Sequence, residues 1–333
     1  LIQFFLFFSK PLALAILAHV QAVLVAGANI CFGLAVREFF RSSRAGIGAA
    51  LGASLYWPLT GQASFFMAEL PFMLFSMLGL FLFARAFNGA QTRLSLFLSG
   101  LTLGTATLIK AQGICAFAPL PLVLLFLPQA RAFRSHLFHL CLGFAIPVLL
   151  QLAINSAHLG RAVFFLSAND AFNLYLGQSR REAVGCFDKS SGYFYIFHNN
   201  NAGLDYRFLA PEILPVSILD REYFRKKTAE LWRSDPMLQL IRSLQNTVEL
   251  FEINPRWPLR NIPQFARADL IFQYLFFLFA VLPAFITCAA HLNSRCLEPY
   301  VVCAVVPVLA VGAVSFFCSG QPRYLLPFSY SFI

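Results

Sequence analysis

The sequence FFMAELPFMLFSMLGLFLFARAF, from Phe65 to Phe87, decides the fold class of this chain. It is apolar over about the 20 residues that a helix needs to cross a bilayer, and Arg85 stands near its end. Similar apolar runs, ended by short basic turns, lie before and after it. Of the 333 residues, 59% are hydrophobic and 12% are charged, whereas soluble domains carry about 25% charged residues. The pattern predicts an all-α polytopic membrane protein with about nine or ten transmembrane helices.

One long polar stretch interrupts this pattern between residues 155 and 268. We therefore expect three parts: transmembrane helices over 1–154, a water-facing domain over 155–268, and further transmembrane helices over 269–333. A soluble helix bundle would not need this layout, whereas a membrane protein with one sizeable external domain would.

The polar domain is expected to be mixed but mainly helical. Residues 192–197 are aromatic and alternate as in a short strand or a loop, and residues 220–233 and 237–251 have the spacing of two helices. The second helix carries an apolar stripe that includes Leu238, Ile241, Leu244 and Val248.

Basic residues mark the orientation of the expected helices. The net charge of +10 comes largely from arginines just outside apolar runs, where they meet lipid headgroups, so a nucleic-acid partner is not expected. The short loops on one side carry Arg37, Arg41, Arg44, Arg85, Arg93, Arg131, Arg134 and Arg295, and those on the other carry Lys10, Lys110 and Arg323. The positive-inside rule then predicts that the arginine-rich loops are cytoplasmic and that the polar domain lies outside.

Three charged residues are expected on this outer face: Glu69, Lys110 and Arg323. A carboxylate in a membrane helix is unfavourable unless it is paired or hydrated, so Glu69 is either a functional group or a glutamate at headgroup level. An arginine fork or a lysine ammonium can hold a lipid-linked phosphate, and either side chain can instead reach the headgroups as an anchor.

A polar cluster follows the apolar run that ends near residue 154. Its members are Asn169, Asp170, Asn173, Tyr175 and Gln178. Amides and carboxylates together suit the hydroxyl groups of a sugar, but the same residues also serve in turns and helix caps. The scattered histidines and cysteines do not predict a metal site, and no cofactor is assigned.

Several short motifs, in their order along the chain, resemble those of the GT-C superfamily of membrane glycosyltransferases. The resemblance is to the bacterial branch related to protein mannosyltransferases and aminoarabinose transferases. The motifs are Val20–Leu24, Leu55–Pro58 followed by Glu69, Leu103–Lys110, Asn173–Gln178, Thr228–Pro236 and Arg323–Pro327.

The resemblance implies transfer of a sugar, with inversion, from a polyprenyl-phosphate donor to an extracytoplasmic lipid, glycan or protein acceptor at the bacterial inner membrane. Glu69 would match the acidic residue of the second external loop, and Arg323 the late arginine near the donor phosphate; Lys110 matches a basic position more loosely. The catalytic carboxylate of the first external loop is expected upstream of Leu1. The chain is expected to be truncated at both ends, because it starts at Leu1 without Met and stops at Ile333 inside an apolar run.

Two other functional classes stay open at this stage. A lipid or glycan transporter would need broken helices or charges at the membrane midplane, whereas the charges here gather at helix ends. A catalytically degenerate scaffold with the same architecture is the other alternative. The sugar, the acceptor, the prenyl length and the oligomeric state are not indicated by the sequence.

Overall fold

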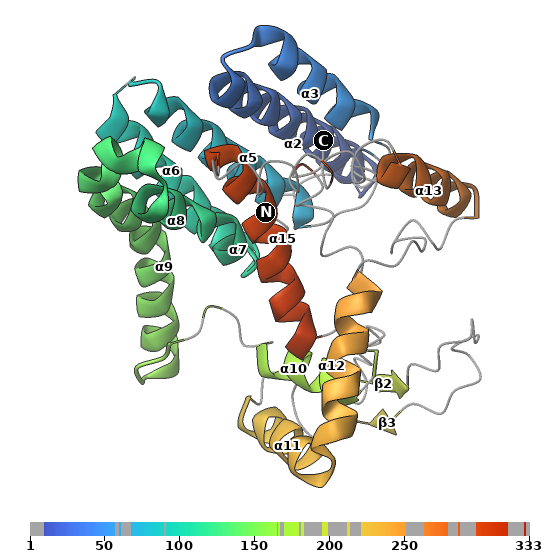
Figure 1. Cartoon of the computed structure of the whole chain (residues 1–333). Coiled ribbons are helices and arrows are strands. Elements are labelled where there is room, and N and C mark those ends of the chain that lie inside the picture. The colour runs from blue at the N-terminus through green and yellow to red at the C-terminus, as the bar shows by residue number, and fades with distance from the viewer. Residues whose placement is uncertain are drawn as a thin grey trace. The chain divides into compact units, whose positions relative to one another are not determined.

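The structure is a computed structural model of the whole chain (Figure 1). It describes residues 10–56, 60, 68–89, 91–164, 166, 170–179, 181–182, 195–198, 212–213, 221–250, 263–278, 286, 298–318 and 330. The chain divides into two compact units. The first comprises Leu1–Leu166, Ile253–Leu309 and Leu325–Ile333, and the second comprises Ser167–Glu252 and Ala310–Tyr324.

The first unit is built from apolar helices. Its elements are α2 (Lys10–Phe40), α3 (Ser43–Leu55), α5 (Glu69–Phe87), α6 (Thr92–Ile109), α7 (Gly113–Phe117), α8 (Pro119–Phe126), the 3-10 helix η2 (Pro128–His136), α9 (Leu137–Leu159), α13 (Pro263–Phe276) and the first part of α15 (Pro299–Phe317). In Figure 1, α3, α2, α5, α6 and α9 follow one another as neighbours, each packed on the next.

Five helices among the described residues are long and apolar enough to cross a membrane. They are Leu12–Phe40, Glu69–Phe87, Thr92–Ile109, Ala130–His158 and Pro299–Phe317. Large apolar side chains also point outward, such as Leu149 and Leu150, which are 61% and 60% exposed. Such an apolar exterior suits lipid as the solvent. The expected class of helical membrane protein therefore agrees with the structure; several of the other expected spans lie partly or wholly outside the described residues.

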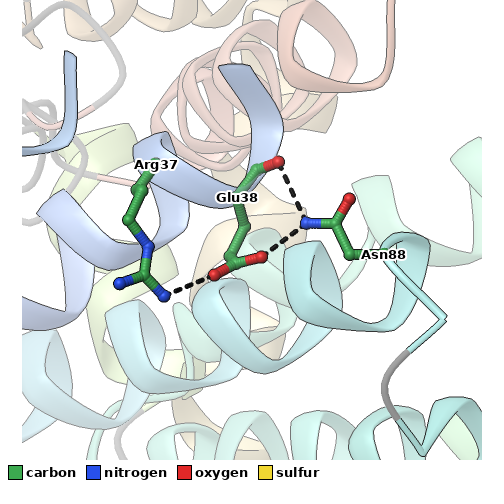
Figure 2. A network of polar contacts seen from close by, with 3 residues as sticks. All are labelled: Arg37, Glu38 and Asn88. Atoms are coloured by element: carbon green, nitrogen blue, oxygen red, sulfur yellow. Dashed lines mark hydrogen bonds and ion pairs between the residues drawn. The ribbon is translucent and has the colours of Figure 1, made fainter. Parts of the chain in front are cut away.

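The helix α5 has two differently charged ends. At its C-terminal end, Asn88 donates hydrogen bonds to the backbone oxygen and to the carboxylate of Glu38, in the last turn of α2 (Figure 2). Arg37 donates to the same carboxylate, with 2.6 Å between Nη2 and Oε1. At its N-terminal end, Glu69 meets Lys110, which follows α6. We call the C-terminal end of α5, with Arg85, and the adjoining end of α2, with Arg37, the arginine-bearing end. The N-terminal end of α5 carries the Glu69–Lys110 pair.

Glycines allow α6 and α9 to approach to backbone contact. A Cβ atom on Gly100 would lie 2.0 Å from the backbone oxygen of Leu140, and one on Gly143 would lie 2.1 Å from that of Phe97. No larger residue fits at either position without a shift of the backbone. Such close packing through small residues is typical of membrane helices.

The Gly-rich helix α3 packs closely on α2 at Gly46. A Cβ atom there would lie 2.6 Å from the backbone oxygen of Gly33 on α2. Gly48 differs, because a Cβ atom there would meet nothing within 4 Å. The same helix therefore has a packed side and an open side.

The second unit is small and mainly helical. Its elements are α10 (Asp170–Ser179), β1 (Arg181–Glu182), β2 (Tyr195–His198), β3 (Glu212–Ile213), α11 (Arg221–Ser234), α12 (Pro236–Leu250) and the last part of α15. The strands form an antiparallel sheet in the order β1-β2-β3, with Arg181 opposite His198 and Tyr195 opposite Ile213. The predicted strand and both predicted helices are confirmed to within a few residues.

Two local contacts explain how these helices begin and pack. Asp235 accepts a hydrogen bond from the backbone N–H of Leu238 at 2.9 Å, the usual N-cap arrangement, and so starts α12. The buried ring of Phe224 on α11 lies 5.0 Å from the ring of Phe172 and 5.5 Å from that of Tyr175, both on α10. These aromatic contacts hold α10 against α11.

The helix α12 turns its polar side inward. Gln239, Ser243 and Asn246 are buried, whereas Leu244 and Val248 from the expected apolar stripe are 54% and 65% exposed. The apolar stripe is therefore present on α12, but it is not the side by which the helix packs in this unit. The burial of amide and hydroxyl groups requires partners, which α10 supplies.

Candidate functional site

Glu69 and Lys110 form a mostly buried ion pair. The Lys110 Nζ atom lies 2.8 Å from Glu69 Oε1, and the two side chains are 19% and 8% exposed. They are far apart in sequence, and the pair forms because α5 begins where α6 ends. The structure therefore brings together two of the charged residues that the sequence singled out.

The local sequence places each partner. Glu69 is in the first turn of α5, where a carboxylate is favoured by the exposed backbone N–H groups and the helix dipole. Lys110 leaves the α-helical conformation at the end of α6, with φ −149° and ψ 122°. The backbone N–H of Gly113 then donates to the Lys110 oxygen at 2.8 Å and closes a tight turn. A Cβ atom on Gly113 would lie 2.5 Å from the backbone nitrogen of Thr107, so this turn requires glycine.

A neighbour of this pair was missed from the sequence. The Oε1 atom of Gln112, two residues beyond Lys110, is buried and has no hydrogen-bond partner among the described residues. A buried acceptor without a donor is unfavourable in an apolar setting, and a ligand can supply the donor. Nothing in the sequence distinguished this glutamine from an ordinary turn residue.

Asp269 is a second polar residue that the sequence did not single out as functional. It is fully buried on α13 and accepts a hydrogen bond from Gln273 Nε2, with 2.7 Å between the donor and Oδ2. Its place at the start of an apolar run was the available signal, because a carboxylate there must be paired or hydrated.

The predicted polar cluster divides between surface and interior. Asn173 on α10 is exposed, whereas Tyr175 is buried against Phe224 and Gln178 is fully buried. Asn169 and the side chain of Asp170 lie outside the described residues, as does Arg323. Within the described part of the cluster, Asn173 is the member that is open to a ligand.

Gln178 lies in the last turn of α10 and connects this helix to its neighbours. Its side-chain Nε2 donates to Ser243 Oγ at 3.2 Å and to the backbone oxygen of Phe317 at 2.9 Å. From α12, Arg242 donates to the backbone oxygen of Gln178 at 2.9 Å, and Asn246 donates to that of Gly177 at 3.0 Å. The last carbonyls of a helix have no partner inside the helix, and here α12 supplies their donors.

The polar side of α12 therefore caps α10, which explains why it faces inward. Lys227 and Glu230 on α11, by contrast, form an exposed ion pair at 2.9 Å. The hydrogen bond from Lys227 lowers the pKa of the Glu230 carboxyl, and the same contact raises the pKa of Lys227.

The described residues contain no group of three or more His, Cys, Asp or Glu side chains that could hold a metal ion. The Glu69–Lys110 pair instead offers a hydrogen-bond acceptor and a cation in one place. Comparison with known proteins finds no matching family model, no similar curated protein and no similar solved structure.

Proposed function

We propose that this chain is a membrane glycosyltransferase that moves a sugar, with inversion, from a polyprenyl-phosphate donor to an acceptor outside the cytoplasm. The Glu69–Lys110 pair is the observation that supports this proposal most directly. It places a carboxylate and a cation together where two membrane-length helices end. A lipid phosphate and a polar acceptor would meet at such a place.

In this proposal, Lys110 binds the donor phosphate and Glu69 binds the sugar or the acceptor. A phosphate that approaches Lys110 can share its three ammonium donors, so that the Glu69 carboxylate becomes free to accept a hydrogen bond. Arg323 is the second proposed phosphate ligand, because its planar fork can hold two phosphate oxygens. Cations near the phosphate would stabilise the charge that develops on the leaving group.

Asn169, Asp170 and Asn173 are the proposed contacts to sugar hydroxyls. Asn173 is supported by its exposure. The proposed topology has about nine or ten spans, the arginine-rich loops in the cytoplasm, and residues 155–268 outside the inner membrane. The proposal needs neither a metal nor a nucleotide, because the prenyl phosphate is both carrier and leaving group.

The test is transfer of a labelled sugar from a synthetic prenyl-phosphate donor by the protein expressed from its full gene and reconstituted in lipid. Lys110→Met should lower transfer at subsaturating donor by about 10- to 150-fold. This range corresponds to about 1.5–3 kcal/mol for a charge-assisted hydrogen bond, at 1.4 kcal/mol per decade. Arg323→Ala should fall in the same range, and Arg323→Lys should recover only part of the loss.

A double variant separates function from folding. Lys110→Met alone leaves the Glu69 carboxylate buried without its lysine, which destabilises the fold. Glu69→Gln combined with Lys110→Met removes both charges and should restore the melting temperature toward that of the wild type, while transfer stays low. Wild-type transfer by Lys110→Met would disprove the phosphate role. A wild-type protein that transfers no sugar from any prenyl-phosphate donor would disprove the proposed activity.

A further inference from the structure

A cavity of about 600 Å³ lies among the helices of the first unit. This volume is within the range of about 300–1,000 Å³ that is usual for small-molecule sites. The wall is mostly apolar, with Phe39 and Phe40 from α2, Gly48 from α3, Leu80 from α5 and Val301 from α15. The parts of α2 and α3 that line it belong to the arginine-bearing end described above.

Two arginines lie in sequence between residues that line this cavity. Phe40 and Ala45 both line it, and between them Arg41, which follows α2, and Arg44, in the first turn of α3, are exposed. Neither arginine has an ion-pair partner in the part of the chain that the structure describes. Arg37, one turn earlier, is already paired with Glu38. Two exposed cations thus stand beside residues that line an apolar cavity, and the described residues offer neither of them an ion-pair partner.

One polar group in the wall also lacks a partner. Ser76 on α5 lines the cavity and is 3% exposed, and its hydroxyl has no hydrogen-bond partner among the described residues. A buried hydroxyl is normally paired, so its environment is incomplete without a further molecule. The small residues of α3 leave room for one, since a Cβ atom on Gly48 would meet nothing within 4 Å.

We propose that this cavity binds an acyl chain of an anionic phospholipid, whose phosphate is held by Arg41 and Arg44. The occupant must be apolar along its length, because the wall is mostly apolar, and anionic at one end, because two cations stand beside residues that line the cavity. Arginine forks suit phosphate oxygens. The lipid comes from the leaflet at the arginine-bearing end and is distinct from the sugar donor: Lys110 lies at the opposite end of α5, whose 19 residues span about 28 Å.

The glycine variants that test this site add a side chain where the structure leaves room for it. Gly48→Leu should fill the cavity without meeting backbone atoms. Gly312→Leu is the matched control, because Gly312 is also a helical glycine with nothing within 4 Å of an added Cβ atom, and it does not line the cavity. Arg41→Gln combined with Arg44→Gln removes the cations and leaves the cavity open.

The measurement is the phospholipid retained by the purified protein, determined by mass spectrometry after equilibration with mixed phosphatidylglycerol and phosphatidylcholine vesicles. We expect the wild type and Gly312→Leu to retain phosphatidylglycerol preferentially. Gly48→Leu should retain at least about tenfold less of either lipid, and the double arginine variant should lose the preference for phosphatidylglycerol, as expected when charge-assisted contacts are removed.

Three results would overturn the proposal. The first is equal retention by Gly48→Leu and wild type, the second is no preference for the anionic lipid in the wild type, and the third is displacement of the phospholipid by a polyprenyl phosphate. The third result would assign the cavity to the donor. The double arginine variant keeps the test decisive if Gly48→Leu does not fold.

Discussion

Arg41 has a backbone conformation that arginine rarely adopts. Its φ is 51°, in the left-handed region, at the residue that follows α2. The backbone N–H of Ser42 donates to the Arg37 oxygen at 3.3 Å, which is the pattern of a helix that ends with a left-handed residue, usually glycine. An arginine there carries about 1–2 kcal/mol of strain. Its charge is a reason to keep it at this position.

Arg41→Gly should therefore stabilise the fold and weaken lipid binding at the same time. Relief of the strain is offset in part by the greater freedom of glycine in the unfolded chain, so we expect a net gain of about 0.5–1 kcal/mol. Thermal unfolding in detergent measures the first effect, and phospholipid retention measures the second. A less stable Arg41→Gly protein would contradict this interpretation of the turn.

The helix α12 shows how an element can be predicted correctly and its contact face missed. The proline after Asp235 and the apolar repeat were enough to place the helix within one residue at each end. An apolar stripe normally marks the packed side of a helix. In this unit the packing is instead decided by the free carbonyls of α10, which need donors from Arg242 and Asn246.

Because the polar side of α12 is its packed side, we expect substitutions of polar residues on α12 to destabilise the protein more than substitutions in the apolar stripe. Asn246→Ala should destabilise the protein by about 1–3 kcal/mol, because the Gly177 carbonyl is left buried without its donor. Val248→Ala should change stability by less than about 0.5 kcal/mol, because Val248 is 65% exposed. Chemical denaturation of both variants measures the two values. A larger loss for Val248→Ala than for Asn246→Ala would show that the stripe is the packed side.

At the scale of the whole molecule, the sequence predicted what composition and periodicity control. The apolar runs predicted the class of helical membrane protein, and the alternation of charged loops put Glu69 and Lys110 on one face, where the structure pairs them. It did not predict the pairing atom by atom, because the register between α5 and α6 depends on packing. Gln112 was not singled out, and Gln178 was interpreted as a possible sugar contact, whereas its buried side chain bonds to Ser243. The partners of both glutamines, or the lack of one, depend on tertiary contacts that the sequence does not show.

We propose that the two ends of the helices in the first unit have separate roles, with Glu69 and Lys110 facing the outside and the turn that carries Arg41 facing the cytoplasm. Fusions after Ser42, Gln112 and Ser190 to alkaline phosphatase, which is active only outside, and to a fluorescent protein, which fluoresces only inside, test it most directly. We expect fluorescence after Ser42 and phosphatase activity after Gln112 and Ser190. Phosphatase activity after Ser42, or fluorescence after Gln112, would contradict it.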